Sequence, residues 1–451
     1  MTPRRFDRPG PGAPTPVRFP AIARETLDSG LGIWVVQHAP VPVATITLIV
    51  SRGTGDDPVD RHGLASLTGD LLDEGAGDRD AIQLADAFAG LGTQLEVDVG
   101  PDATALSVTT LSRVLGPVLA LMADVVARPR LAAADFNRVR ELRLNRLRQL
   151  SRSAATVADR MYVSAVFGTH AYGHGALGTT ASLDAITLED TREFWTRMYA
   201  SSTATLIVVG DVQADEVVRE ARRAFGRWVG SIESGPRLTA PDAPPDPRVF
   251  LVDRPGAPQA ELRLGHLGPP RQTPVYHALV GVNAVLGGQF TSRINRRLRE
   301  EMGVTYGART TFDFRRVGGA FSCDSSVDAT AAADAVRDVL TEFDLIREGP
   351  VPDDELASAK ASLTRGYVRN FETGGQIARA VAQIATHGLP DDTFDRFVPA
   401  IEAITAEQVQ AAAEVFIRPA DATIVVVGDA ERSREALAAI GRPVVVSAPE
   451  F

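Results

Sequence analysis

The segment from Leu298 to Tyr306 carries the most specific chemical pattern in the sequence and reads Leu-Arg-Glu-Glu-Met-Gly-Val-Thr-Tyr. Within it, Arg299 and Tyr306 lie on either side of Gly303, a residue type that commonly ends a helix. A guanidinium and a phenol on the two sides of a helix end can hold a substrate carbonyl and donate hydrogen bonds to the oxyanion that forms when water attacks it. Arg299 and Tyr306 are therefore the candidate catalytic residues.

A glycine-rich segment, Gly287 to Arg293, precedes this pattern and reads Gly-Gly-Gln-Phe-Thr-Ser-Arg. Ser292, or the threonine before it, can cap the N-terminus of a helix. Ile294, Leu298 and Met302 then recur at every fourth position, which would give one apolar helix face directed at the core. We expect a helix that begins near Ser292 and ends at the glycine after Met302.

Charged residues on this predicted helix indicate which arginine is available for chemistry. Arg296 and Arg297 each have a glutamate four residues further on, Glu300 and Glu301, a spacing typical of ion pairs on a solvated helix face. Arg299 has a glycine at that position instead. The spacing therefore predicts that Arg299 is free to contact another partner.

A second candidate site lies between Gly63 and Asp70, where the sequence reads Gly-Leu-Ala-Ser-Leu-Thr-Gly-Asp. Leucines at helical spacing predict a helix over 63–74. Ser66 and Asp70 are four residues apart and would share one face of that helix.

A third segment, 170–179, reads His-Ala-Tyr-Gly-His-Gly-Ala-Leu-Gly-Thr. His170 and His174 are four residues apart, but the glycines around them disfavour a helix in which they would share a face. We interpret the segment as a loop that sets the start of the next helix.

Together, these three segments resemble the insulinase/pitrilysin family of zinc peptidases, the inverzincins, and they span nearly the whole chain. The zinc helix of that family carries His-x-x-Glu-His, in which the histidines bind zinc and the glutamate activates water. The resemblance places these three residues at Ser66, Gly69 and Asp70. It also places the arginine and tyrosine of the family's second-domain pattern at Arg299 and Tyr306.

The resemblance implies that the zinc motif of this chain is degenerate. Serine is a poor zinc ligand, and Gly69 has no side chain that could act as a base. The distal glutamate ligand of the family should fall near Asn145 or Arg146, and neither residue is a carboxylate. We therefore expect no metal in this chain.

A family member that keeps the arginine and tyrosine but lacks the zinc ligands resembles the non-catalytic chain of a processing-peptidase-like, two-chain peptidase. The implied partner is a homologous H-x-x-E-H subunit that holds the zinc, so the pair would be a heterodimer. The implied substrates are unfolded peptides, bound partly by adding a strand to a sheet edge. In such a pair Arg299 and Tyr306 would act in trans, and the chain alone would be inactive.

Two other functions stay open from the sequence. The chain could be a structural or peptide-binding member of the family, in which the arginine and tyrosine are only inherited. It could instead be a zinc peptidase with unusual ligands drawn from His62, Asp70, Asp73 and Glu74. A homodimer also stays open.

Strands and helices of the first half occur in separate runs, which favours an α+β fold over a doubly wound parallel sheet. Alternation and β-branched residues predict strands at 43–51, 94–99 and 105–111, the last two paired as antiparallel neighbours. Helical spacing predicts helices over 81–89, 113–127 and 132–167.

One unit of the sequence occurs twice. Ala-Ile-Thr at 185–187, a helix and a strand ending in Gly-Asp at 210–211 reappear, at a constant offset, as 403–405, a helix and 428–429. A proline-rich stretch from Gly235 to Arg248 separates the copies and reads as a linker. The sequence thus predicts two homologous domains, 16–232 and 249–440, each an antiparallel sheet packed with helices in a duplicated insulinase-type fold.

The bulk composition agrees with two domains and disfavours some classes of function. The chain has 451 residues, 44% of them hydrophobic, which is more than one compact core accommodates. A formal net charge of −10 disfavours a nucleic-acid partner. No apolar run has the length of a membrane span or a secretory signal, so we expect no membrane contact and a cytoplasmic location. The single cysteine, Cys323, is expected to be buried in a strand.

Overall fold

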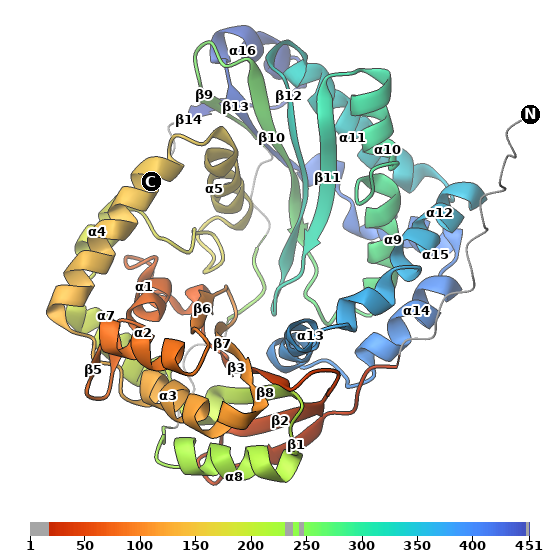
Figure 1. Cartoon of the computed structure of the whole chain (residues 1–451). Coiled ribbons are helices and arrows are strands. Elements are labelled where there is room, and N and C mark those ends of the chain that lie inside the picture. The colour runs from red at the N-terminus through yellow and green to blue at the C-terminus, as the bar shows by residue number, and fades with distance from the viewer. Residues whose placement is uncertain (1–17, 231–237, 243–247, 448–450) are drawn as a thin grey trace, which may run out of the picture.

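Two six-stranded sheets form the framework of the molecule (Figure 1). The computed structural model describes residues 18–230, 238–242, 248–447 and 451, so much of the predicted linker between Gly235 and Arg248 lies outside the described residues. The strand order of the first sheet is β1-β2-β8-β3-β7-β6. The order of the second sheet, counted from the matching edge, is β14-β9-β13-β10-β12-β11.

The predicted strands are present in the first sheet. Its strands are β1 (Ala23–Thr26), β2 (Gly32–Gln37), β3 (Val43–Val50), β6 (Glu96–Val99), β7 (Thr104–Leu111) and β8 (Ala204–Gly210). The strands of the second sheet are β9 (Val249–Asp253), β10 (Gln259–Gly268), β11 (Thr305–Asp313), β12 (Gly319–Asp328), β13 (Thr423–Gly428) and β14 (Val444–Ser447). β6 and β7 pair in antiparallel fashion, as the sequence predicts.

Five strands of each sheet correspond in order and direction. β8 and β13 are parallel to β2 and β9 on one side and antiparallel to β3 and β10 on the other. The next two strands outward are antiparallel in both sheets. The α+β fold with two related units of sheet and helices is thus confirmed. The first sheet also contains one parallel pair, β2–β8, and the second contains two, β9–β13 and β9–β14, because β8, β13 and β14 return through helical connections rather than hairpins.

The internal repeat has the same local structure in both copies. Thr187 caps α7 (Leu188–Met198) and Thr405 caps α15 (Ala406–Phe416), each with a capping box and with φ −106° and ψ 164°. The strands that follow, β8 and β13, both end in glycine. Identical caps at identical spacing are the local signature that a duplication predicts.

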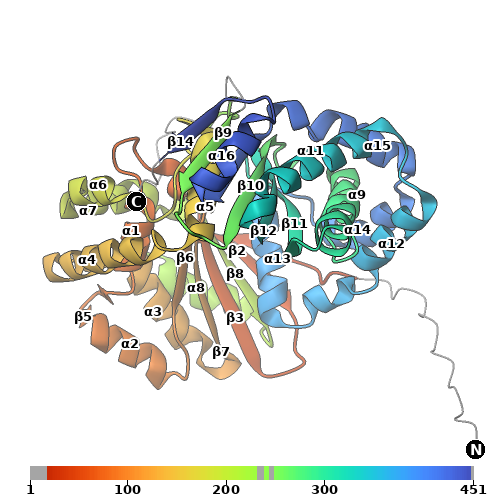
Figure 2. The same cartoon turned by 90° about the horizontal axis from the view of Figure 1, so that it is seen from above.

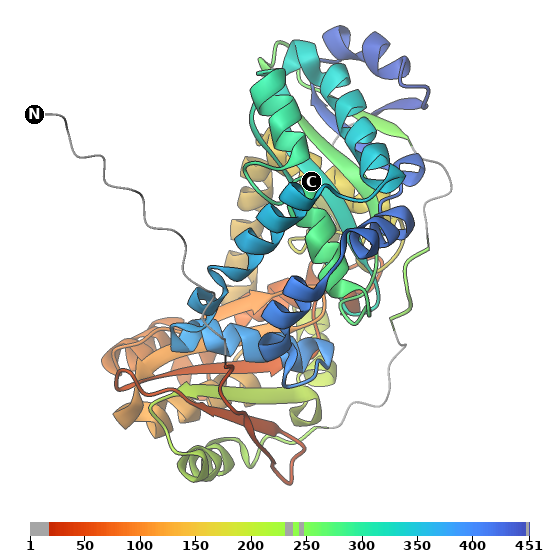
Figure 3. The same cartoon turned by 90° about the vertical axis from the view of Figure 1, so that its right-hand side faces the viewer.

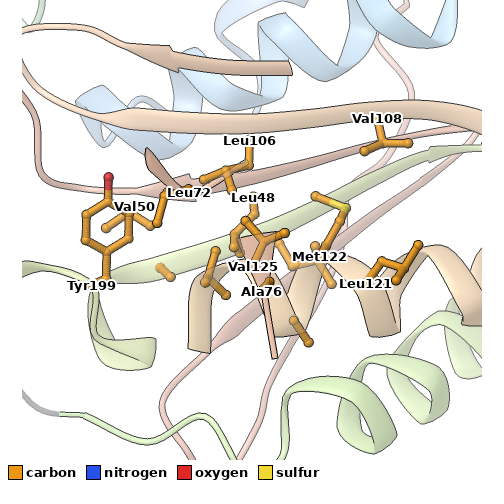
Figure 4. Packing of buried hydrophobic residues seen from close by; sticks show 14 of the residues in the cluster. Leu48, Val50, Leu72, Ala76, Leu106, Val108, Leu121, Met122, Val125 and Tyr199 are labelled. Carbon is orange, nitrogen blue, oxygen red and sulfur yellow. The ribbon is translucent and has the colours of Figure 1, made fainter. Parts of the chain in front are cut away.

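The core of the first half lies between its sheet and its helices. The other helices of this half are α1 (Leu64–Leu71), α2 (Ala81–Gly90), α3 (Leu115–Ala127), α4 (Ala133–Leu150), α5 (Ala154–Phe167), α6 (Thr180–Ala185) and α8 (Ala214–Phe225). In Figure 4, Leu48 of β3 and Leu106 of β7 pack close to Leu121, Met122 and Val125 of α3. This apolar cluster fixes the sheet on which α1 rests.

The second half has a comparable core. Its helical elements are α9 (Tyr276–Leu286), α10 (Arg293–Asn295), η4 (Arg296–Glu301), α11 (Ala332–Glu348), α12 (Asp353–Thr364), η6 (Tyr367–Phe371), α13 (Gly374–His387), α14 (Thr393–Ala403), α15 and α16 (Ala430–Ala438). Cys323 is buried on β12, as predicted, and burial raises the pKa of its thiol. Among the described residues, no helix combines the length and apolar character that crossing a membrane requires.

Each half places one helix on the sheet of the other half (Figures 1 and 3). α5 packs Val157 and Tyr162 against Val425 of β13, and the Tyr162 hydroxyl donates to the carbonyl of Phe321 at 2.6 Å. α13 makes the reciprocal contact with β3 and β8 through a second apolar cluster. Strands covered on both faces need apolar residues on both faces, which explains why β8 and β13 are continuous runs of β-branched residues.

The predicted helix over 132–167 is wrong in one respect, because it consists of two helices. α4 ends at Leu150, and α5 begins after Ser153, whose hydroxyl accepts a hydrogen bond from the N–H of Thr156. The break redirects the chain, so that α4 stays with the first half while α5 lies beside β10 (Figure 2). Apolar spacing continues through both helices, and only the N-cap serine marks the break.

Candidate functional site

α1, the helix with the degenerate zinc motif, begins at a buried carboxylate. Its N-cap residue, Gly63, has a φ of 95°, where a side chain would be strained. Asp57 caps the helix from outside, because its two oxygens accept the N–H groups of Gly63 and Ala65 at 2.7 and 2.6 Å. Burial raises the pKa of Asp57 to about 7. The start of the helix is thus fixed by residues that the motif does not include.

A buried guanidinium lies against the face of α1 where the family carries zinc ligands. Arg143 of α4 donates from Nη1 to Ser66 Oγ at 2.8 Å and from Nε to the Asp70 carboxylate at 2.7 Å. The Arg143 side chain is only 5% exposed, and burial lowers its pKa. Ser66 and Asp70 share one helix face, as predicted, and the cation between them belongs to the chain itself.

Gly69, which the resemblance places at the glutamate of the motif, packs closely against β6. A Cβ at this position would lie 2.5 Å from Cγ2 of Val99 on β6. That distance is far shorter than a van der Waals contact, so a glutamate at position 69 would displace Val99. The place of the family's general base is therefore occupied by the close approach of α1 to β6.

The residues at this site do not fit zinc. Zinc in proteins takes thiolate, imidazole or carboxylate ligands in a tetrahedral set. Ser66 Oγ donates to the carbonyl of Ala176, and Asp70 is bound by Arg143. In the part of the chain that the structure describes, no three His, Cys, Asp or Glu side chains are grouped so that they could hold a metal ion.

The alternative zinc ligands consist of His62, Asp70, Asp73 and Glu74. The His62 ring instead stacks on the His174 ring, with centroids 4.1 Å apart, and Glu74 forms an ion pair with Arg138. Burial and the charges of Glu74 and Asp70 raise the pKa of Asp73 to about 6. The structure therefore does not bring these four side chains together around one point.

The expected position of the distal ligand is also wrong. Asn145 and Arg146 lie on the exposed face of α4, where Asn145 contacts Glu141. Arg143 is the residue of α4 that reaches α1, because it follows Val139 at helical spacing on the buried face. An arginine on an otherwise apolar helix stripe is the signal that could have singled out this residue from the sequence.

Arg299, one of the two candidate catalytic residues, is not free as the spacing predicts. Its Nη2 donates to Glu300 at 2.9 Å, and its guanidinium carbon lies 3.4 Å from the centroid of the Phe290 ring. Its Nη1 is buried and has no hydrogen-bond partner among the described residues. Arg296, the predicted partner of Glu300, pairs with Glu355 instead.

The predicted helix contains a π-helical turn and keeps one of the two predicted ion pairs. The expected helix is present as α10 followed by η4, which is π-helical, and Gly303 ends it with a φ of 68°. The Arg297–Glu301 pair is present at 2.9 Å. Ser292 precedes the helix but donates to Gln289 rather than capping.

Tyr306, the other candidate, is 92% exposed in a β-bulge of β11. The step from Thr305 to Ala308 opposes only two residues of β12, and such bulges redirect side chains. Asn295 fixes the bulge, because its Nδ2 donates to the Ala308 carbonyl at 2.7 Å and its Oδ1 accepts the Ala308 N–H at 2.8 Å. Asn295 therefore positions Tyr306 through the backbone of the bulge. Like Arg143, it was not singled out from the sequence.

The histidines of segment 170–179 bond to backbone groups. His170 Nε2 lies 2.9 Å from the Thr239 carbonyl, and its Nδ1 accepts the N–H of Tyr172 at 3.1 Å. His174 Nε2 lies 3.1 Å from the Thr54 carbonyl, and burial lowers its pKa to about 4. These contacts support the interpretation of the segment as a structural loop.

Family models match both halves of the chain. The model of the insulinase family, peptidase family M16, matches residues 33–180, and the model of the peptidase M16 inactive domain matches residues 185–363. The chain therefore belongs to the insulinase family of M16 peptidases. A relative from Mycobacterium leprae (strain TN), described as an uncharacterized zinc protease, is 26% identical over 403 residues, 89% of this chain and 90% of the relative. A relative from Streptomyces coelicolor with the same description is 23% identical over 420 residues, 92% of this chain and 91% of the relative.

Solved structures share the duplicated fold. A crystal structure of a peptidase M16 inactive domain from Pseudomonas fluorescens superposes with a TM-score of 0.84 at 25% identity, over 90% of this chain and 98% of that one. A protease from Helicobacter pylori superposes with a TM-score of 0.85 at 17% identity, over 90% of this chain and 99% of that one. The two-unit framework is thus the fold of this family.

Proposed function

We propose that the chain is the non-catalytic subunit of a two-chain zinc peptidase and lends Arg299 and Tyr306 to a peptide bound at the zinc of an H-x-x-E-H partner. The observation that carries the proposal is the position of the Arg143 guanidinium. It lies between Ser66 and Asp70, where the resemblance places the zinc-binding histidines, and so it occupies the space that a metal ion would need. One structural relative is described as an inactive domain, and sequence relatives are described as zinc proteases. These descriptions support a family with both non-catalytic and catalytic chains.

The two candidate residues differ in the part they would play. Tyr306 presents its hydroxyl to solvent from a bulge held by Asn295, so it can donate to an oxyanion that another chain generates. Arg299 is held against Phe290 with its side chain 20% exposed, so it can hold a peptide carbonyl with little loss of side-chain freedom. Because the Arg299 side chain and the backbone that carries Tyr306 are held before the substrate arrives, less reorganisation is needed during the reaction.

The peptide would add as a strand to β6 rather than to β11. Both are edge strands of their sheets. On β11, Asn295 already occupies the N–H and carbonyl of Ala308, and the N–H of Thr310 donates to the Gly287 carbonyl at 3.2 Å. β6 pairs with β7 alone among the described strands and lies next to α1. An extended peptide could therefore pair with β6 through main-chain hydrogen bonds.

The test is reconstitution with a homologous H-x-x-E-H subunit encoded in the same genome. We expect this chain alone to hold no stoichiometric zinc and to leave a flexible fluorogenic peptide uncut. The pair should contain about one zinc per heterodimer and should cleave far faster than the partner alone, because only the pair has all the groups that the reaction needs. One equivalent of zinc in this chain alone, with chelator-sensitive cleavage, would overturn the proposal.

A further inference from the structure

A cavity of about 790 Å³ lies in the second half, away from both segments of the proposed function. Its walls come from the segment before α9, from η6, from the exposed side of α13 and from the start of α14. α9 and α14 are neighbours in the fold (Figure 1). A volume of several hundred Å³ is the size that ligand sites for small molecules usually have.

Aromatic rings form one wall of this cavity. The rings of Tyr367 and Phe397 stack almost parallel, with centroids 4.3 Å apart and an interplanar angle of 12°. Phe371 meets the Tyr367 ring edge-on at 5.3 Å, and His277 lies 5.8 Å from the Phe397 ring. Burial lowers the pKa of His277, which favours its neutral form. The wall therefore offers flat apolar surfaces suited to a planar ring.

Two arginines at the same cavity have no acidic partner among the described residues. The guanidinium carbon of Arg271 lies 3.7 Å from the centroid of the Tyr276 ring, and neither Arg271 nor Arg379 forms an ion pair with a described carboxylate. Burial lowers the pKa of Arg271, and its partly desolvated charge is met by the Tyr276 ring rather than by a described carboxylate. Arg396, by contrast, is already paired with Asp392 at 3.1 Å. An anion at Arg271 would supply the missing counter-charge.

The segment that carries Arg271 is held in place by backbone contacts. The N–H of Arg271 donates to the Arg315 carbonyl at 2.9 Å. The next side chain, Gln272, donates to the carbonyl of His387 at the end of α13, at 2.7 Å. The cation and the aromatic wall therefore have a fixed relative position before a ligand binds, which reduces the entropy lost on binding.

From this arrangement we infer that the cavity binds a small planar aromatic acid, with its carboxylate on Arg271 and its ring against the wall of Tyr367 and Phe397. Guanidinium groups favour carboxylates through paired hydrogen bonds, and the ring wall selects against anions that lack a flat apolar part. Arg379 would add a second positive charge at the rim. The site does not depend on the proposed peptidase partnership.

Isothermal titration calorimetry on the full chain tests this inference with three probes: 2-naphthoate, its neutral analogue 2-naphthamide, and inorganic phosphate. We expect one equivalent of 2-naphthoate to bind, and the other two probes to bind at least about tenfold more weakly, because each lacks one of the two recognition elements. Arg271→Gln should weaken 2-naphthoate by about tenfold or more. Arg140→Gln is the matched control, since Arg140 also lies over an aromatic ring, that of Phe136 at 5.3 Å, on α4.

Thermal unfolding of both variants shows whether they keep the fold, and Arg379→Gln gives a second variant at the rim, where a smaller loss of affinity is expected. The inference is overturned if 2-naphthoate does not bind, if 2-naphthamide or phosphate binds as tightly, or if folded Arg271→Gln binds like the Arg140→Gln control.

Discussion

Arg143 donates from Nε to one carboxylate oxygen of Asp70 at 2.7 Å, and its Nη2 forms an ion pair with the same oxygen at 2.7 Å. The family resemblance places the second zinc-binding histidine at Asp70, and in this chain that carboxylate forms an ion pair with Arg143. A guanidinium stays charged at any accessible pH and cannot dissociate as a metal ion can. The exchange makes the site a permanent structural element.

The first prediction concerns the stability that Arg143 contributes. Arg143→Met keeps most of the side-chain volume but removes the charged hydrogen bonds to Ser66 and Asp70. We expect the free energy of unfolding to fall by about 2 kcal/mol, because charge-assisted hydrogen bonds typically contribute about 1.5–3 kcal/mol. Urea denaturation measures this change in the free energy of unfolding. Arg146→Met, on the exposed face of the same helix, is the control and should change the value by less than about 0.5 kcal/mol.

A second prediction is that the zinc position can be rebuilt. A glutamate at position 143 would end near the present Arg143 Nε, and histidines at 66 and 70 would face it from α1. The triple variant Ser66→His/Asp70→His/Arg143→Glu should therefore bind about one zinc per chain, measured by elemental analysis after dialysis. It should still not cleave peptides, because Gly69 leaves it without a base. A folded triple variant that binds no zinc would show that Arg143 does not mark the metal position.

The duplicated α+β framework could be predicted from the sequence, because its signals are local. Caps such as Thr187 and Thr405, and alternating strands such as 105–111, are visible in the order of residues alone. The exchange of α5 and α13 between the sheets could not be predicted, since it depends on contacts between residues far apart in the chain. The family resemblance located the degenerate motif on α1.

The contacts of the candidate residues could not be predicted from the sequence. Arg296 pairs with Glu355 of α12 instead of Glu300, and helical spacing alone does not predict a contact between residues that far apart in the chain. The contact of Arg299 with Phe290 joins a loop to a helix and leaves no periodic signal. Arg143 lies two residues before Asn145 and three before Arg146, the expected ligand positions. The family spacing does not fix which face of α4 turns towards α1.

A third prediction concerns pH. Neutral His266 accepts the N–H of Arg418 at Nε2, at 2.9 Å, and its Nδ1 lies 2.9 Å from the Leu267 carbonyl. Burial lowers its pKa to about 4, below the ordinary value of 6.5. The unfolded chain therefore binds more protons at this residue, and the contribution of His266 to the free energy of unfolding should be lost as pH drops from about 6.5 to about 4. His174, with a pKa of about 4, acts in the same direction, whereas Asp57 and Asp73, whose pKa values burial raises, act in the opposite direction, so the His266 contribution is the difference between the wild-type chain and His266→Asn.

This pH prediction is checked by NMR titration of the imidazole signals, with His266→Asn used for assignment, alongside urea denaturation at several pH values. A His266 signal that titrates near pH 6.5 in the folded protein would contradict it.

A fourth prediction concerns Asn295. Asn295→Ala leaves the N–H and carbonyl of Ala308 without their partner, so we expect the free energy of unfolding to fall by about 1–3 kcal/mol. Hydrogen exchange at Ala308 and Tyr306 should become faster, because the bulge loses its support. Asn145→Ala, at an exposed position of α4, is the control. Unchanged exchange in β11 would mean that Asn295 does not position Tyr306.

The central claim is that Tyr306 assists a reaction on the partner's zinc site, and the most direct measurement is the turnover of the reconstituted pair carrying Tyr306→Phe. The change removes one hydroxyl from a side chain that is 92% exposed, so folding and assembly should survive. We expect kcat to fall by about tenfold or more with little change in peptide affinity, since a single donor to an oxyanion is typically worth about 10²–10³ in rate. Arg299→Ala should lower both rate and affinity, whereas Arg434→Ala, on the exposed surface of α16, should change neither. Unchanged turnover in Tyr306→Phe and Arg299→Ala, with the pair intact, would contradict the account and leave the chain a structural member of the family.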